Sequence, residues 1–516
     1  MLKKSSSIRP RDKNLEPQYI KSENRKTSQR GASSPLIVVY GFLAIIIMGA
    51  ILLYLPFSHY EKISFIDALF TATSATTVTG LIVLDTASSW TIIGQIIIAL
   101  LIILGGIGFM TGAAFFLIAA GQSLGLTRRV QIGQGLGEEK LDSVRGLVLK
   151  VVISSLFFQI LGAVIFLILF NLSFDNNFKD NLWLSVFHSI SSFNNAGFTI
   201  FQENSNLEIF SRGTLNNLIL IFTSLLFFLG GIGYFVMNDL VHHRKILGRR
   251  GFRRFRVLLS LETKMILIGS IALTIIGTFL IFIFEFQNIQ TIGEFTTFEK
   301  VINSLFTSMS TRTAGFNSFD MSLTHDYTNI ICAIFMFIGG GPASTAGGIK
   351  ITTFILSLLM ILSHLRGKEN ITFSGREIPY SLGVRSLIIL VLSIFIVLIM
   401  IVIILIFEEQ YNFAFLTFEV FSAFATNGMS TGASSLLHKN GPVAAVRLLG
   451  VGCTGLTDET ADQLGLFDAE EKTRRSTLNH TLDQITQKFG NRAIGELSDN
   501  SQEKSGLSTQ VKRGDD

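Results

Sequence analysis

Four short segments of this chain combine a lone glycine with hydroxyl or amide side chains, a pairing suited to binding a dehydrated cation. Glycine tolerates backbone dihedrals that other residues avoid, so successive carbonyl oxygens can point inward and replace the water around an ion. The glycines are Gly80, Gly197, Gly315 and Gly428, at spacings of 117, 118 and 113 residues. Because a constant spacing indicates repeated units, the sequence predicts a pore of four like parts.

The candidate cation-binding residues are these glycines and the residues just before them. Backbone carbonyls would bind the ion, and the neighbouring hydroxyl and amide groups, including Asn194, would brace the strands. Glycines also allow close helix packing in membranes, but four at near-equal spacing favour a filter. The predicted filter comprises Thr77, Val78, Thr79 and Gly80; Asn195, Ala196 and Gly197; Thr313, Ala314 and Gly315; and Thr426, Asn427 and Gly428.

The composition indicates that these segments lie in a membrane. Hydrophobic residues make up 48% of the chain and charged residues 15%, and Phe occurs 46 times, which is typical of a membrane protein. About 20 apolar residues cross the roughly 30 Å of bilayer hydrocarbon. Seven runs meet this expectation, near residues 35–56, 91–120, 147–170, 214–237, 264–284, 328–362 and 386–407.

A short apolar segment precedes each repeat glycine and is too short to cross the bilayer. These segments cover residues 65–79, 182–193, 301–310 and 413–424. A helix that enters the membrane and returns is tolerated where its non-helical part lines a water-filled cavity. The repeat unit is therefore predicted as a span, a re-entrant helix, a filter strand and a second span. The negative ends of the helix dipoles would favour a cation.

Lys and Arg collect in the basic segment 1–34 and in loops at 128–145, 244–256 and 366–385. The positive-inside rule makes these segments and the N-terminus cytoplasmic, and such short loops do not favour nucleic-acid binding. Acidic residues predominate in the loops expected on the other side, namely Asp175, Asp180, Glu285, Glu294, Glu299, Glu408 and Glu409.

Three of the glycine segments, at 77–81, 193–198 and 311–317, resemble signatures of the Trk/Ktr/HKT potassium transporters, most closely the bacterial Ktr membrane subunit. The resemblance covers about residues 35–437. It implies an all-α integral membrane protein with four membrane-pore-membrane repeats around one ion pathway, and no enzymatic activity.

The same resemblance implies potassium uptake across the plasma membrane, with potassium bound at the filter and no covalently bound cofactor. Glycine at all four filter positions favours potassium; sodium or mixed-cation transport is the alternative, and sodium is a candidate coupling ion. The implied partners are a second copy of the chain, the lipid bilayer and a cytoplasmic ring of nucleotide-binding regulatory subunits. No nucleic acid is expected.

The sixth apolar run is interrupted by a segment that cannot sustain a helix, since it contains five glycines and a proline. Polar backbone at membrane depth must face water or protein. The segment resembles the intramembrane gating loop of the family, which lies under the filter. It comprises Gly339, Gly340, Gly341, Pro342, Ala343, Ser344, Thr345, Ala346, Gly347, Gly348, Ile349 and Lys350.

Five ionisable residues have two interpretations each. Asp67 and Glu299 open re-entrant helices, where an acid stabilises the N-terminus, although either could also concentrate cations at the outer mouth. Arg312 would repel a cation if it faced the pathway, so bracing the filter from behind or pairing with an acid is favoured. His188 is expected to pack in the core and not to bind a metal. Lys350 could reach the cytoplasmic interface or pair with an acid.

The fourth repeat lacks a recognisable second span after Gly428. The repeats are therefore expected at 35–121, 122–240, 241–364 and, incompletely, 365–437, with a polar tail at 438–516. Parts of the tail, about residues 440–495, resemble the C-terminus of Y-family translesion DNA polymerases, in which Gln463, Leu466 and Phe467 would contact a sliding clamp. The alternatives are thus an inactive truncated fusion and, from another class, a membrane-anchored clamp-binding appendage.

Overall fold

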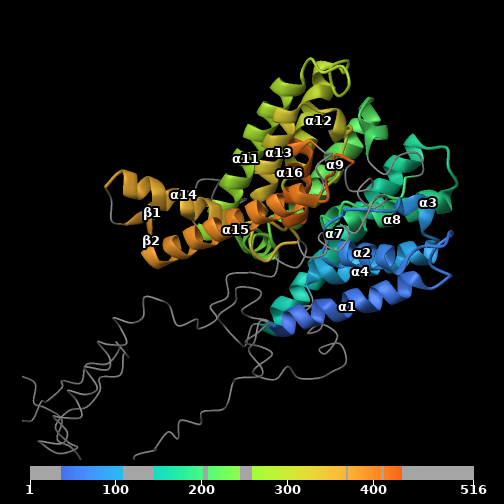
Figure 1. The fold of residues 1–516 in the computed structure, drawn as a ribbon, viewed down its shortest axis with the longest axis horizontal. Coiled ribbons are helices and arrows are strands. Elements are labelled where there is room, and N and C mark those ends of the chain that lie inside the picture. Colours follow the sequence, from blue (N-terminus) through green and yellow to red (C-terminus); the bar gives the residue numbers. More distant parts are fainter. Residues whose placement is uncertain are drawn as a thin grey trace, which may run out of the picture. The chain divides into compact units, whose positions relative to one another are not determined.

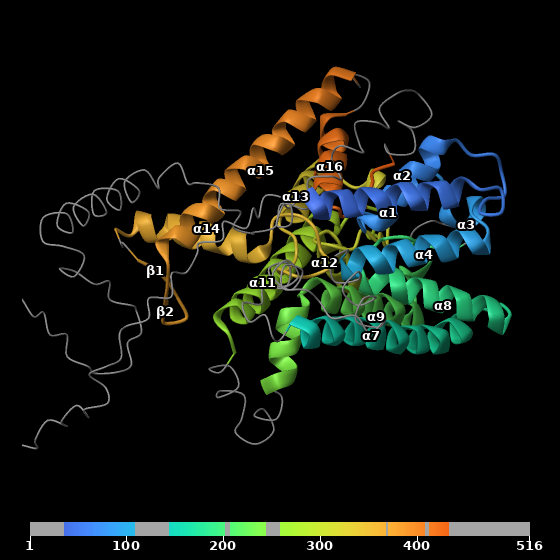
Figure 2. The ribbon, with the colours of Figure 1, turned by 90° about the horizontal axis from the view of Figure 1, so that it is seen from below.

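A computed structural model describes residues 36–108, 144–201, 207–243, 259–367, 370–407 and 412–432. This part of the chain is almost entirely helical (Figures 1 and 2), as the composition predicts. The basic segment 1–34, two of the basic loops, the position of an eighth span and the clamp-like tail lie outside the described residues. Predictions about them stay predictions.

The helices follow the order expected of repeated membrane-pore-membrane units. In the first three repeats a long helix packs on the short helix that follows it. The first repeat contains α1 (Leu36–Tyr54), α2 (Phe65–Thr76), α3 (Thr86–Ser89) and α4 (Ile92–Ile107). The second contains α7 (Val144–Ser173), α8 (Phe178–Phe193), η2 (Glu208–Phe210) and α9 (Thr214–Gly231).

The third repeat has the same order, and the fourth is described as far as residue 432. The third contains α11 (Leu261–Glu285), α12 (Thr297–Ser310), η3 (Met321–Leu323), α13 (Asp326–Phe337) and α14 (Ile351–Leu365). An antiparallel hairpin of β1 (Ile371–Phe373) and β2 (Arg376–Ile378) then leads to α15 (Tyr380–Phe407) and α16 (Phe413–Phe424).

Among the described residues, four helices are long and apolar enough to cross a membrane, namely α7, α9, α11 and α15. The predicted sixth run, 328–362, consists of α13 and α14 with a non-helical segment between them, as its glycines indicate. The span predicted near 214–237 is present as α9, but it is shorter than expected, because α9 ends at Gly231 and a further helix covers 234–243. Gly233, with φ of 93°, lies in the interruption. In the predicted run 91–120, α4 ends at Ile107 before Gly108, with φ of 83°.

The predicted capping role of Asp67 and Glu299 is confirmed. The hydroxyl of Ser64 accepts from the backbone N–H of Asp67, whose carboxyl accepts from the backbone N–H of Ser64, a capping box that begins α2. Thr296 and Glu299 form the same arrangement at α12. The backbone N–H of Gly213 also donates to Glu299 at 2.8 Å, and this bond holds the pKa of the Glu299 carboxyl below its ordinary value.

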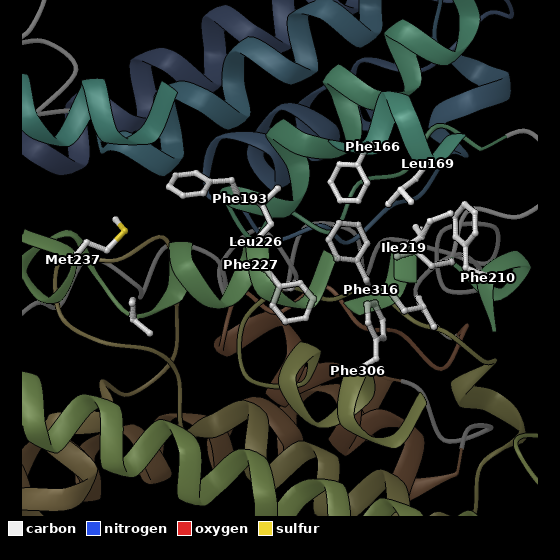
Figure 3. Close-up of a cluster of buried hydrophobic side chains, with 14 of the residues drawn as sticks. Phe166, Leu169, Phe193, Phe210, Ile219, Leu226, Phe227, Met237, Phe306 and Phe316 are labelled. Atoms are coloured by element: carbon white, nitrogen blue, oxygen red, sulfur yellow. The ribbon is translucent and has the colours of Figure 1, made fainter. Parts of the chain in front are cut away.

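A core of aromatic side chains joins the second repeat to the third behind the candidate filter. Phe227 of α9 contacts Phe306 of α12 and Phe316, with ring centroids 5.8 Å and 6.5 Å apart (Figure 3). Phe193, at the end of α8, is buried in the same cluster. Burial of each large aromatic side chain contributes about 2–3 kcal/mol, so this core positions two pore helices against each other.

Glu285 was expected in an outer loop, but it is the last residue of α11 and is fully buried, with 0% of its surface exposed. Its carboxyl group accepts from Asn288 Nδ2 at 2.7 Å, from Thr291 Oγ1 at 2.8 Å and from the backbone N–H of His325 at 3.2 Å. The hydroxyl of Thr328 donates to it as well. Four donors satisfy the carboxyl group, so burial does not leave it without partners.

We expect Glu285→Ala to lower the free energy of unfolding by about 2–4 kcal/mol, because several buried donors would lose their acceptor. Thermal unfolding of the purified protein in detergent measures the loss. Glu294→Ala is the control, since Glu294 is exposed and pairs with Arg212 at 3.3 Å and surface pairs contribute little. Equal unfolding midpoints for the two variants would contradict this prediction.

Candidate ion-conduction site

The four repeat glycines come together in a closed ring. A methyl group on each glycine would overlap the carbonyl oxygen of the residue that precedes the glycine of the next repeat. The distances from the added carbon are 2.3 Å from Gly80 to Ala196 O, 2.8 Å from Gly197 to Ala314 O, 2.0 Å from Gly315 to Asn427 O and 2.2 Å from Gly428 to Thr79 O. The fourth contact returns to the first strand, so the ring closes among the described residues.

The backbone of the ring has a left-handed conformation at each glycine, with φ of 85°, 71°, 73° and 90° in chain order. In three strands the residue two positions earlier is left-handed too, namely Val78, Asn195 and Thr426, with φ of 56°, 59° and 47°. This conformation is rare for a β-branched residue such as Val78. Such strain persists where the surrounding structure imposes it, and it concentrates at functional sites.

Side chains next to the ring hold the strands to their own pore helices. The hydroxyl of Thr77 donates to Thr73 O at 2.7 Å and lies 2.8 Å from Thr79 Oγ1. The amide of Asn194 donates to Ile190 O at 2.8 Å. These contacts agree with the predicted bracing by hydroxyl and amide groups.

Other side chains join one strand to the next. Asn427 Nδ2 donates to two carbonyl oxygens of the third repeat, Ser310 O at 2.8 Å and Thr311 O at 2.9 Å. The hydroxyl of Thr313 donates to Asn195 Oδ1 at 3.0 Å. The second, third and fourth strands are therefore linked by side-chain hydrogen bonds.

Three further residues that brace the filter strands were not predicted from the sequence. The hydroxyls of Ser310 and Ser422 donate to Phe316 O at 2.7 Å and Met429 O at 2.6 Å, beyond the glycines of their strands. Glu419, buried in α16, accepts from the backbone N–H of Thr431 at 3.1 Å and from Ser430 Oγ. The sequence features that could have identified them are a serine near the end of a pore helix and an acidic residue within an apolar segment.

A recurring pattern, Leu-Gly-Gly-Ile-Gly at 104–108 and 229–233, was also missed. In each copy the first glycine packs directly against the end of a pore helix. A methyl group would lie 1.9 Å from Thr76 O at Gly105 and 1.9 Å from Phe193 O at Gly230. The second helix of these repeats can approach the filter only because no side chain intervenes.

The predicted loop between α13 and α14 packs against the filter strands near their pore helices. Asn195 Nδ2 donates to Thr345 Oγ1. A methyl group on Gly347 would lie 1.9 Å from Thr426 Oγ1 and 2.2 Å from Ala425 O. The loop therefore contacts the second and the fourth strand, which are opposite each other in the cyclic order of the ring.

The loop also fills the interruption after α9. The backbone N–H of Tyr234 donates to Ala343 O at 3.1 Å, and that of Gly341 donates to Gly231 O at 2.9 Å. Within the loop, the ammonium group of Lys350 donates to Ala346 O at 2.6 Å. The loop is thus packed into the protein by backbone contacts, which suits non-helical backbone at membrane depth.

Arg312 lies behind the third strand and is 5% exposed. Its guanidinium group donates to Ser270 O at 3.2 Å, to Ser270 Oγ at 3.3 Å and to Gly339 O at 3.3 Å. These acceptors are neutral oxygens of α11 and of the loop. The bracing interpretation of Arg312 is supported over pairing with an acid.

His188 lies in the aromatic core. Its Nε2 is 3.0 Å from Thr223 Oγ1, and its ring centroid is 4.7 Å from that of Phe166 and 5.5 Å from that of Phe316. No group of His, Cys, Asp or Glu side chains suited to a metal occurs within the described ranges. Burial among aromatic rings fits the packing role expected of this residue.

Long apolar helices, re-entrant helices and a closed glycine ring define a multi-pass integral membrane protein built around one pathway. The family model described as TrkH, cation transport protein, matches residues 17–446. The chain belongs to this family.

The names of similar proteins agree with the assignment to this family. The chain is 38% identical to Ktr system potassium uptake protein B of Bacillus subtilis over 82% of this chain and 91% of the relative. It is 33% identical to the protein of the same name from Vibrio alginolyticus, over 85% and 92%. It is 31% identical to the potassium/sodium uptake protein NtpJ of Enterococcus hirae, over 84% and 93%. These relatives are transporters, which confirms the expectation that the chain is not an enzyme.

The fold is similar to that of a solved transporter. The crystal structure of the potassium transporter TrkH from Vibrio parahaemolyticus matches with a TM-score of 0.59 and 16% identity, covering 83% of this chain and 84% of that one.

The family match ends at residue 446. It does not support the resemblance of the tail to DNA polymerases.

We expect Asn427→Ala to destabilise the protein by about 1–3 kcal/mol, because two buried carbonyl oxygens of the third repeat lose their donor. The midpoint of thermal unfolding in detergent measures the change. Asn216→Ala is the matched control, since the half-buried amide of Asn216, in the first turn of α9, donates to Arg212 O at 2.8 Å within its own repeat and joins no two strands. An unchanged midpoint for the Asn427 variant would show that this link does not stabilise the ring.

Proposed function

We propose that this protein takes up potassium across the plasma membrane through the ring formed by Gly80, Gly197, Gly315 and Gly428. The single observation that carries the proposal is the closed cycle of backbone contacts among the four strands. Only a ring can surround an ion with carbonyl oxygens from all sides and replace its hydration shell. The chain's membership in a cation transport family supports the same function.

The pore helices would add a favourable potential for a cation. Four pore helices, α2, α8, α12 and α16, end four or five residues before a ring glycine, at Thr76, Phe193, Ser310 and Phe424. The C-terminal end of a helix carries about half a negative charge. Four such ends converge on one position, which supports cation and not anion binding.

Potassium is the preferred substrate on two grounds. All four strands keep glycine at the ring position, and two of the relatives are named as potassium uptake proteins. Mixed potassium and sodium transport is the second candidate, since a third relative is named for both ions. Sodium as a coupling ion belongs to this second candidate.

The loop at 338–350 would act as the gate. Its contacts with Asn195 and with Thr426 support a position across the pathway on the side of the pore-helix ends. Regulatory partners are proposed because two relatives belong to a Ktr system. The basic segments at 1–34, 128–145, 244–256 and 366–385 support a cytoplasmic N-terminus. The proposed partners are a nucleotide-binding ring of regulatory subunits on the cytoplasmic side and a second copy of the chain.

We expect Gly315→Ala to lower potassium uptake at least about tenfold, because an added methyl group would displace Asn427 O from the ring and change the ion's ligands. Uptake of rubidium by a transporter-deficient strain that expresses the chain, together with growth on limiting potassium, measures the loss. Gly146→Ala is the control, since a methyl group there meets no atom within 4 Å.

Uptake at the wild-type rate by the Gly315 variant would refute the ring as the pathway. No uptake by the wild-type chain under conditions in which it reaches the membrane would refute transport by this polypeptide. Competition between rubidium and sodium in the same cells separates the two candidate substrates.

A further inference from the structure

The third strand is connected by side-chain hydrogen bonds to the second strand, the fourth strand and the loop. Its residues 311–313 make three different contacts in succession. Thr311 O accepts from Asn427 of the fourth strand, Arg312 donates to Gly339 O at the start of the loop, and Thr313 donates to Asn195 of the second strand. Movement of the loop or of a neighbouring strand would therefore break a hydrogen bond of the third strand or shift that strand.

Both the oxygen and the nitrogen of the Asn195 side-chain amide form hydrogen bonds. Its Oδ1 accepts from Thr313 Oγ1 at 3.0 Å, and its Nδ2 donates to Thr345 Oγ1 of the loop. The residue is fully buried, with 0% of its surface exposed, and its backbone is left-handed. An amide with a fixed donor and a fixed acceptor has one favoured orientation, so Thr345 helps to determine how Asn195 is held.

The loop is fixed more firmly at its base than at Thr345. At the base, the backbone N–H of Gly339 donates to Ile349 O at 2.9 Å and that of Ile349 donates to Phe337 O at 3.0 Å, while Arg312 binds Gly339 O. At Thr345, the backbone N–H reaches Gly230 O only at 3.4 Å and the hydroxyl reaches Phe193 O only at 3.5 Å. The side chain to which the Thr345 hydroxyl is bonded is that of Asn195.

We propose that Asn195 is a specificity-determining positioning residue whose orientation depends on Thr345, so that the loop sets the ion preference of the ring as well as its opening. This inference rests on the proposed function. Displacement of Thr345 leaves a buried amide N–H without its acceptor, which favours rotation of the Asn195 side chain. Rotation then removes the acceptor of Thr313, so two adjacent strands lose their common support.

The consequence for selectivity follows from the coordination of the ion. Discrimination between potassium and sodium depends on the number and arrangement of the oxygens that surround the ion. Two strands that shift together change half of the ring. The loop position seen in this structure therefore corresponds to the selective state, and a displaced loop corresponds to a less selective one.

The test measures ion binding and uptake in the full-length chain with three loop or filter variants. Thr345→Val removes the hydroxyl at nearly constant volume, Thr345→Ser retains it, and Thr313→Val removes the donor at the other end of the Asn195 amide. Thr278→Val is the control, since its hydroxyl donates to Thr274 O at 2.7 Å within α11. Binding is measured as thermal stabilisation of the purified protein by potassium and by sodium, which needs no opening of the gate.

For each protein, the concentrations of sodium and of potassium that give half of the maximal thermal stabilisation are compared as a ratio. We expect Thr345→Val and Thr313→Val each to reduce this sodium-to-potassium ratio by about threefold or more, because both disturb the same ligands. Thr345→Ser keeps the wild-type ratio, because it retains the hydroxyl group. The double variant that combines Thr345→Val with Thr313→Val lowers the ratio no further than either single variant. A change in uptake rate with an unchanged ion ratio in both variants overturns this inference and leaves the loop as a simple gate. Absence of potassium-dependent stabilisation in the wild type overturns the proposed function itself, and this inference with it.

Discussion

The direct backbone approach of four strands is the constraint on which the rest of the structure depends. At Gly315 an added methyl carbon would lie 2.0 Å from Asn427 O, well inside the contact distance of two atoms. The ring therefore requires glycine for space as well as for its left-handed dihedrals. The same requirement extends outward, since Gly105 and Gly230 let the second helix of a repeat contact the end of a pore helix.

A strand of polar backbone inside an apolar bilayer must have every group satisfied by protein, by water or by the transported ion. The short pore helices meet this need on the side away from the pathway, with Ser310 and Ser422 bonded to the outgoing chain. Arg312 serves the same purpose between α11 and the loop. The charged and amide groups near the ring thus act as supports for the strands.

Much of this arrangement could be predicted because it depends on local chemistry. A glycine-rich segment with a proline cannot remain helical, and 338–350 does not. Ser64 with Asp67, and Thr296 with Glu299, have the spacing of a capping box, which favours the start of a helix. Glu285 could not be predicted, because its burial depends on donors from 288, 291, 325 and 328 that converge only after folding. The interruption after Gly231 was missed because the apolar composition continues through it.

The sequence by itself determined the number of repeats, the position of each pore helix and the four glycines, since all three depend on spacing and on the properties of single residues. The tertiary structure alone decided which strand follows which around the ring, and which side chain reaches across it. Asn195 lies between Thr313, 118 residues later, and Thr345, 150 residues later. No local pattern encodes such contacts, because they arise only when separate repeats pack their backbones together.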